Sequence, residues 1–201
     1  MACSNRRISR ASRRGTKAPA ADWLHEIKQD GYRLIVQREG KRLRLFTRNG
    51  HDWSDRYPLI REAALRNRNN SFVIDGEAVL LGVDGISDFD GLHSRKHDDE
   101  VRFYAFDCLV SDGEDIRKLP LGMRKANLSR LLARRVDGIF LSEFEQGEIG
   151  PGLFRHACLM GLEGLVSKHR DRPYRAGRSP HWIKIKNGKR PEMSRVMDAF
   201  S

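Results

Sequence analysis

One lysine stands at a position where its side-chain amine can act as a nucleophile. Lys28 follows the Trp-Leu-His-Glu-Ile stretch at residues 23–27 and precedes Asp30 and Gly31, at the half-buried start of a β-run. Burial disfavours the charged ammonium form of lysine, and a neutral amine is a nucleophile. The sequence therefore predicts a lysine that can form a covalent adduct.

Acidic residues interrupt three apolar stretches that are predicted to be strands. Asp75 and Glu77 divide the run at residues 72–80, Asp107 follows Phe-Tyr-Ala-Phe, and Glu163 lies in Gly-Leu-Glu-Gly-Leu-Val. Carboxylates placed this way can bind a divalent metal ion. The alternative for each acid taken singly is an edge-strand charge or a structural ion pair.

Two further lysines lie on one face of a predicted strand near the end of the chain. The segment His-Trp-Ile-Lys-Ile-Lys at residues 181–186 alternates, so Lys184 and Lys186 share one face and the isoleucines share the other. Two cations on one face can hold a phosphate group. Together with Lys28 and the acids, they form a coherent set for nucleotidyl transfer through a lysine adduct.

Several common sites are absent from the sequence or unsupported by it. The chain has no P-loop, no dinucleotide-binding glycine motif and no G-x-S-x-G motif. His93 and His97 lie four residues apart in a polar stretch without a third ligand, so we interpret them as solvated rather than as a zinc site. The three cysteines are isolated and odd in number, which favours reduced thiols.

Hydrophobic patterning predicts a mixed α+β domain of mainly antiparallel sheets. A hairpin is predicted around Gly40, and residues 87–95 are expected to be a short connection. The expected strands are residues 32–39, 41–48, 72–81, 101–110, 164–169 and 181–186, and the expected helices are residues 58–68, 120–135 and 153–160.

Six short motifs, in this order, resemble the ATP-dependent DNA ligases, specifically the adenylation domain of bacterial end-joining ligases. The resemblance covers about residues 23–187. It rests on Glu26-Ile27-Lys28-Gln29-Asp30-Gly31-Tyr32-Arg33, Thr47-Arg48-Asn49-Gly50, Ile74-Asp75-Gly76-Glu77, Tyr104-Ala105-Phe106-Asp107, Glu163-Gly164-Leu165-Val166-Ser167-Lys168 and Trp182-Ile183-Lys184-Ile185-Lys186. It implies an ATP-grasp-like nucleotidyltransferase domain of mainly antiparallel sheets flanked by helices.

The resemblance also implies roles for the residues around the nucleoside. Lys28 would attack the α-phosphorus of ATP, release pyrophosphate and carry AMP as a phosphoramidate. Glu26 would face the adenine edge, and Phe106 would stack on the purine. Arg33 and Glu77 would hold the ribose, with Glu77 also contributing to the metal site.

The remaining implied roles concern phosphate, metal and DNA. Lys184 and Lys186 would clamp the α-phosphate, and Lys168 would lie beside it. Glu163 would bind Mg²⁺ or Mn²⁺, which suit a hard site of carboxylates beside phosphates. Arg48 would meet the 5′-phosphate of DNA at a nick or break, to which AMP passes before a 3′-hydroxyl displaces it.

Charge and length set the expected domain organisation. The 201 residues carry a formal charge of +11, and residues 1–21 contain six basic residues and no acid. We expect a disordered basic tail over 1–21, an adenylation domain over 22–187 and a short tail over 188–201. The first tail is a phosphate-binding arm, a solvated tail without function or a transit peptide. No apolar run is long enough to span a membrane, which predicts a cytoplasmic protein.

An OB-fold domain follows the last lysine motif in the ligase family, and the 15 residues from Asn187 onward are too few to form one. We therefore expect weak activity: slow self-adenylation, dependence on an end-binding or repair partner, or action on pre-adenylated ends alone. Two other function classes stay open. One is a non-catalytic nucleotide- or DNA-end-binding module, and the other is an RNA ligase or capping-type guanylyltransferase.

Overall fold

The computed structural model describes residues 20–134, 136–148, 150–177 and 179–188. Nearly all of the two predicted tails, 1–21 and 188–201, lies outside the described residues, and the predicted domain limits stay a prediction. The elements, in chain order, are a 3₁₀ turn (Ala20–Asp22), β1 (Trp23–Ile27), β2 (Tyr32–Glu39), β3 (Arg42–Thr47), α2 (Pro58–Arg66), β4 (Ser71–Val79), α3 (Phe89–Ser94), β5 (Arg102–Ser111), β6 (Glu114–Asp115), α4 (Leu121–Leu131), β7 (Ile139–Leu141), β8 (Phe144–Gln146), α5 (Gly150–Leu159), β9 (Gly164–His169) and β10 (Trp182–Lys186).

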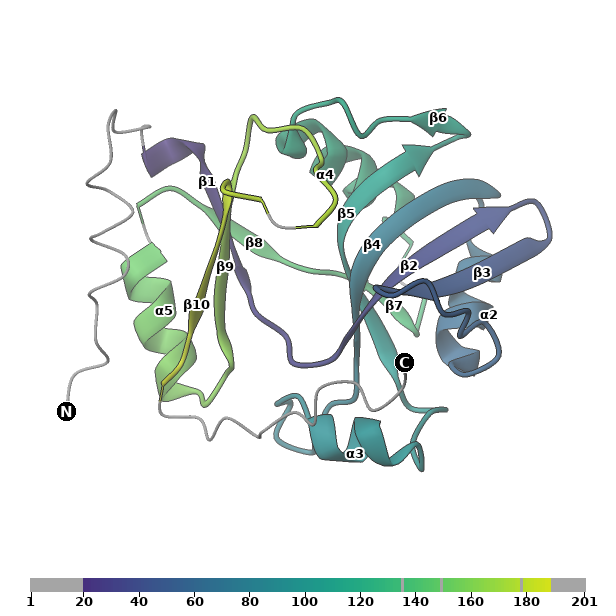
Figure 1. Cartoon of the computed structure of the whole chain (residues 1–201), viewed down its shortest axis with the longest axis horizontal. Coiled ribbons are helices and arrows are strands. Elements are labelled where there is room, and N and C mark those ends of the chain that lie inside the picture. The colour runs from purple at the N-terminus through teal and green to yellow at the C-terminus, as the bar shows by residue number, and fades with distance from the viewer. Residues whose placement is uncertain (1–19, 135, 149, 178, 189–201) are drawn as a thin grey trace.

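The strands form two sheets, which confirms the predicted α+β class with mainly antiparallel pairing. The smaller sheet has the order β10-β9-β1-β8, and the larger has the order β3-β2-β4-β5-β6. The pairing is antiparallel throughout, apart from β7, which adds to β5 in parallel. Figure 1 shows the chain passing from β1 in the smaller sheet to β2 in the larger one, so the β1–β2 connection joins the two sheets.

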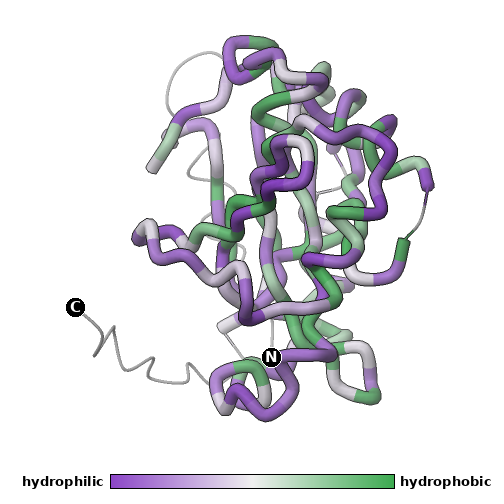
Figure 2. The backbone as a smooth tube through the Cα atoms, turned by 90° about the vertical axis from the view of Figure 1, so that its right-hand side faces the viewer, coloured by the Kyte–Doolittle hydropathy of each residue, from purple (hydrophilic) through white to green (hydrophobic). Residues whose placement is uncertain are grey.

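Helices cover one face of each sheet. The main core lies between the larger sheet and helices α2 and α4, where Leu34, Ile60 and Leu128 are fully buried. A smaller cluster joins Phe154 of α5 to Leu165 of β9. In Figure 2 the hydrophobic stretches run through the middle of the molecule, while most hairpin turns and loops at its edges are hydrophilic. The opposite sheet faces are left for the polar side chains that interrupt the strands.

The predicted hairpin, strands and helices are confirmed, with shorter or shifted ends. The helix expected at residues 120–135 spans Leu121–Leu131, and the one expected at 153–160 begins three residues earlier, at Gly150. Residues 87–95 connect two strands as expected, but no helix was predicted there. The structure has helix α3 in this segment, capped by the Asp88 carboxylate. Strand β1 was not among the expected strands, and Lys28, expected at the start of a β-run, follows the end of β1 instead. Strands β6, β7 and β8 were also missed, since two or three residues carry too little pattern.

Candidate active site

Lys28 lies directly after β1, where the backbone holds it against the start of β9. Its backbone N–H donates to the Gly164 carbonyl over 2.9 Å, and its ammonium forms an ion pair with the Glu163 carboxylate. Gly164 itself permits the close approach of β10 on its other side, because a Cβ there would lie 2.0 Å from the Ile185 carbonyl oxygen. The lysine side chain is 14% exposed, so it is screened from bulk water yet reachable.

Glu26, near the end of β1, is a buried carboxylate held by two ammonium groups. Lys125 of α4 and Lys168 of β9 approach its oxygens at 2.6 and 2.7 Å. Burial acts to raise the pKa of Glu26, but the two lysines outweigh it and hold that pKa below its ordinary value. Burial of an ionised group is tolerated when it is paired in this way.

Lys125 was not predicted as a site residue from the sequence. The structure buries it almost completely and places its ammonium 4.8 Å from the centre of the Phe144 ring. Helical spacing gives no signal for this role, because the partner Glu26 lies about 100 residues away in the chain.

Phe106 and Trp182 form an aromatic corner beside Lys168. The Lys168 ammonium lies 4.0 Å from the Phe106 ring centre and 4.5 Å from that of Trp182. The two rings meet edge to face at 6.1 Å, and the Arg33 guanidinium lies 5.6 Å from Phe106. Both rings therefore border Lys168 and Arg33. Stacking of Phe106 on a purine stays a prediction.

Two of the acids expected in strands form ion pairs with buried or partly buried arginines. Asp75 accepts hydrogen bonds from Arg33 at 3.0 and 2.6 Å and from the Tyr174 hydroxyl at 3.0 Å. Asp107 accepts two from the fully buried Arg124 at 2.8 and 2.9 Å. The structural ion pair that was the alternative interpretation therefore holds for both aspartates. The Arg33 guanidinium is directed at Asp75 and Tyr174, although Glu77 opposes it in the strand register.

Glu77 and Glu163 are the two carboxylates left for a metal ion. Burial raises the pKa of Glu77 to about 7, against the opposing fields of Lys28, Arg33 and Lys184. Lys28 thus acts on both carboxylates, through an ion pair with Glu163 and through its field at Glu77.

The donor set fits Mg²⁺ or Mn²⁺ only when a nucleotide shares the ion. Within the described part of the chain, no group of three or more His, Cys, Asp or Glu side chains is arranged to hold a metal. Magnesium is usually bound by one or two carboxylates together with substrate phosphates. Glu77 and Glu163 match that requirement.

The lysines of β10 share one face, as predicted. Lys184 and Lys186 are exposed, whereas the intervening Ile185 packs toward the α5 cluster. Their strand pairs with β9 so that Lys186 opposes Gly164. Burial lowers the pKa of Lys184, and the positive charge of Lys28 lowers it further.

Arg48 lies apart from this group, in the exposed turn after β3. Its charge contributes to the lowered pKa of Lys184, so its field reaches the edge of the site. The structure thus brings together the predicted residues on β1, β4, β5, β9 and β10, with Arg33 on β2, and leaves Arg48 at the margin.

The residues that the sequence excluded from the site lie away from Lys28 or carry no metal geometry. His93 shares a hydrogen bond with the Tyr32 hydroxyl, and His97 contacts Glu100, both at the surface. Cys108 is a free, buried thiol, and Cys3 lies outside the described residues. No helix in the described ranges has the length and apolar content to cross a membrane.

Comparison with known protein families identifies the family to which this chain belongs. Residues 6–186 match the model of the ATP dependent DNA ligase domain. The chain belongs to this family. The match includes all six motifs and every predicted site residue, which confirms the resemblance inferred from the sequence.

Relatives within the family include end-joining proteins. The chain is 36% identical over 171 residues to the multifunctional non-homologous end joining protein LigD of Pseudomonas aeruginosa, covering 84% of this chain and 20% of that protein. It is also 36% identical over 171 residues to the LigD of Mycobacterium tuberculosis, covering 84% of this chain and 22% of that one. The chain therefore spans about a fifth of these curated relatives.

Solved structures of family members share the fold. The ligase domain of M. tuberculosis LigD superimposes with a TM-score of 0.73 at 33% identity, covering 86% of this chain and 57% of that one. A mycobacterial DNA ligase D complexed with ATP and MES superimposes with a TM-score of 0.72 at 31% identity, covering 86% and 58%. The nucleotidyltransferase fold expected from the sequence is therefore confirmed.

Proposed function

We propose that this chain is the adenylation part of an ATP-dependent DNA ligase that acts in the repair of DNA breaks. The observation that carries the proposal is the position of Lys28, a partly buried amine in contact with Glu163 and within the fields of Glu77 and Lys184. The similar mycobacterial DNA ligase D, solved in complex with ATP, supports ATP as the nucleotide. We place the activity in the cytoplasm, where bacterial DNA lies.

The first step uses the amine of Lys28. A bond forms between Nζ and the α-phosphorus of ATP, and the bond from that phosphorus to the pyrophosphate oxygen breaks. The ammonium loses a proton before attack, and Glu163 is the carboxylate in contact with it. Lys184 and Lys186 on the exposed face of β10 would neutralise charge that develops on the α-phosphate.

Recognition of the nucleoside would involve Glu26, Phe106, Lys168, Arg33 and Glu77. The fixed, ionised Glu26 would accept from the adenine amino group, and Phe106 would supply a ring for stacking. Lys168 contacts Glu26 and the Phe106 ring, which would place it beside the base. The family resemblance implies that it also lies beside the α-phosphate. Arg33 and Glu77, which are paired across β2 and β4, would hold the ribose.

The later steps involve DNA. The AMP phosphorus would form a bond with an oxygen of the DNA 5′-phosphate as its bond to Lys28 breaks. A 3′-hydroxyl would then attack that 5′-phosphate, form the phosphodiester and release AMP. Arg48, in an exposed turn near Lys184, would contact the 5′-phosphate.

Glu77 and Glu163 would hold the divalent ion. When bound, Mg²⁺ or Mn²⁺ would neutralise phosphate charge and orient the leaving pyrophosphate. The ion is expected to add to the positive charge of Lys184 and Lys186.

Formation of a covalent adduct tests the proposal. Purified protein is incubated with ATP labelled at the α-phosphate and with Mg²⁺ or Mn²⁺, then separated by denaturing electrophoresis. We expect label on the wild type and none on Lys28→Ala. Lys118→Ala is the matched control, since Lys118 is an exposed lysine between β6 and α4, and it should label like the wild type.

Absence of label from a folded wild type that binds ATP would contradict the adenylation step. A pre-adenylated nicked duplex then separates the remaining hypotheses. Sealing of that duplex would keep a ligase that acts after adenylation, and failure to seal it would favour a nucleotide- or DNA-end-binding module.

A further inference from the structure

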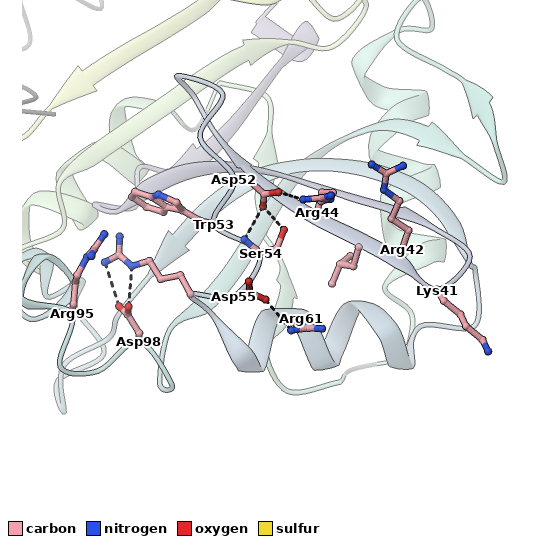
Figure 3. Close-up of a pocket in the computed structure, with 12 residues that line it drawn as sticks. Lys41, Arg42, Arg44, Asp52, Trp53, Ser54, Asp55, Arg61, Arg95 and Asp98 are labelled. Carbon is pink, nitrogen blue, oxygen red and sulfur yellow. Dashed lines mark hydrogen bonds and ion pairs between the residues drawn. The ribbon is translucent and has the colours of Figure 1, made fainter. Parts of the chain in front are cut away.

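A cavity outside the adenylation site opens at the edge of the larger sheet. It has a volume of about 820 Å³ and lies where the β2–β3 hairpin meets the loop before α2 and the end of α3 (Figure 3). Its lining consists of Lys41, Arg42, Leu43, Arg44, Asp52, Trp53, Ser54, Asp55, Arg56, Arg61, Arg95 and Asp98. Six of these side chains are basic and three are acidic, so the cavity has a net positive charge.

The acids are already paired, which leaves three cations available. Asp52 pairs with Arg44, Asp55 with Arg61 and Asp98 with Arg56. The other three basic side chains, those of Lys41, Arg42 and Arg95, make no hydrogen bond or ion pair with the described residues. In Figure 3, Lys41 and Arg42 extend from the hairpin without a dashed line.

Strand register connects this region with the face that carries the adenylation site. Arg42 opposes Glu39 and Arg44 opposes Gln37, and opposed residues lie on the same face of a sheet. Along β2, Glu39 and Gln37 alternate onto the same face as Arg33. Arg42 and Arg44 therefore project from the sheet face that bears Arg33.

The spacing along the hairpin suits a nucleic-acid backbone. Arg48 and Arg42 are six positions apart, a span of about 20 Å at the rise of a β-strand. One strand of duplex DNA carries a phosphate about every 3.4 Å along the helix axis, so this span corresponds to roughly six base pairs. Cations at Arg48, Arg44 and Arg42 could therefore contact successive parts of one arm.

We propose that the three available cations Lys41, Arg42 and Arg95, together with the paired but partly exposed Arg44, bind the phosphate backbone of duplex DNA about six base pairs from the break. These four residues are here called the hairpin surface. DNA as the partner class follows from the proposed function. The hairpin surface would hold the duplex arm while Arg48 contacts the reacting end. It would act through charge alone, with no preference for base sequence.

The lining residues favour DNA over a small apolar ligand as the occupant of the cavity. A small apolar ligand has little apolar lining to bury against, because Leu43 and Trp53 are the only large hydrophobic side chains among the lining residues of this cavity. A polyanion can neutralise all three available cations at once, and the release of its counterions adds to affinity. An acidic protein segment is the competing occupant, and the experiment includes it.

The salt dependence of DNA binding tests the proposal. Binding of the full chain to a fluorescent nicked duplex with arms of about 15 base pairs is measured by anisotropy over a range of salt concentrations. The test variant is Arg42→Gln with Arg95→Asn, because Arg95 has a left-handed φ of 62° that asparagine tolerates. We expect the slope of log K against log salt to become shallower by about 2.

A matched variant separates local contact from general loss of charge. Arg134→Gln with Arg155→Gln removes the same charge from two exposed arginines outside the hairpin surface, and its slope should equal that of the wild type. Equal slopes for the test and control variants would overturn the proposal. The difference in slope between the test and control variants should also vanish when one duplex arm is shortened below about six base pairs. Persistence of this difference with both arms shortened would also overturn the proposal.

Two further measurements keep the outcomes distinct. A fluorescent polyglutamate peptide replaces DNA in a parallel titration, and loss of peptide binding with unchanged DNA slopes would assign the surface to an acidic protein instead. Labelling of Lys28 by ATP is measured for all proteins and should be the same. If the wild type fails to label while the DNA slopes still differ, the hairpin surface stands and the adenylation step is refuted.

Discussion

The molecule uses ion pairs in two regions under opposite conditions. In the interior, the pairs of Glu26 with Lys125 and Lys168, and of Asp107 with Arg124, are buried. At the hairpin surface, the side chains of the Arg44–Asp52 pair are 44% and 32% exposed. The same chemical groups therefore serve as fixed structure in one place and as an adaptable electrostatic surface in the other.

The contrast follows from the dielectric environment. When one partner of a buried ion pair is removed, the other charge stays buried without a counter-charge or water. Breaking such a pair therefore lowers stability strongly, even where forming the pair added little. An exposed pair is screened by water and salt and contributes little to stability, but its charges act on a partner that approaches from solution. We expect the buried ion pairs to hold side chains in a fixed geometry, and the hairpin surface to provide affinity for a polyanion.

The largest effect is expected from breaking a buried pair. Arg124→Met leaves the Asp107 carboxylate without its partner in a fully buried position, and should lower the free energy of unfolding by about 3–5 kcal/mol. Urea denaturation followed by circular dichroism measures this. A double variant, Arg124→Met with Asp107→Leu, should regain part of the loss, and a double variant as unstable as the single one would show that packing rather than charge dominates.

A smaller effect is expected from the pH dependence of Glu77. Burial raises its pKa to about 7 in the folded protein, against an ordinary value of 4.5. Between these values the folded state holds a proton that the unfolded state releases, so stability falls as pH rises from about 5 to 7, by roughly 2 kcal/mol. Urea titrations at several pH values, with EDTA present, measure the fall. Glu77→Gln should flatten the curve in this window, and an unchanged curve would refute the assignment.

The smallest effect is expected at the exposed edge. Arg44→Gln removes a partner from Asp52, and should change the free energy of unfolding by less than about 0.5 kcal/mol, because exposed pairs are worth little. The same variant should make the salt slope of DNA binding shallower by about 1. A loss of stability close to that of Arg124→Met would remove the distinction between the two regions.

The sequence predicted the larger elements because their patterns are local. Alternation placed Lys184 and Lys186 on one face of a strand, and the apolar runs on either side of Asp75 and Asp107 marked two central strands. Short pieces such as β7 and β8 escaped prediction, because they form only when β5 and β1 are present to pair with them.

Part of the candidate site was also accessible from the sequence. The motif around Lys28 and the acids of the strands indicated nucleotidyl transfer, and family membership is confirmed. Whether Asp75 or Glu77 would be left free could not be decided, because that depends on which carboxylate Arg33 reaches in three dimensions. The roles assigned to individual residues stay predictions until adduct formation is measured.

Residue order and type determined the longer strands, the position of Lys28 as the predicted nucleophile and the excess of positive charge, since these depend on neighbours a few positions apart. Tertiary structure alone decided that Lys125 reaches Glu26, that Lys168 does so from 142 residues away, and that Arg42 lies on the face that bears Arg33. The physical reason is that ion pairing and burial depend on distance in space. That distance is set by how the two sheets and their covering helices pack.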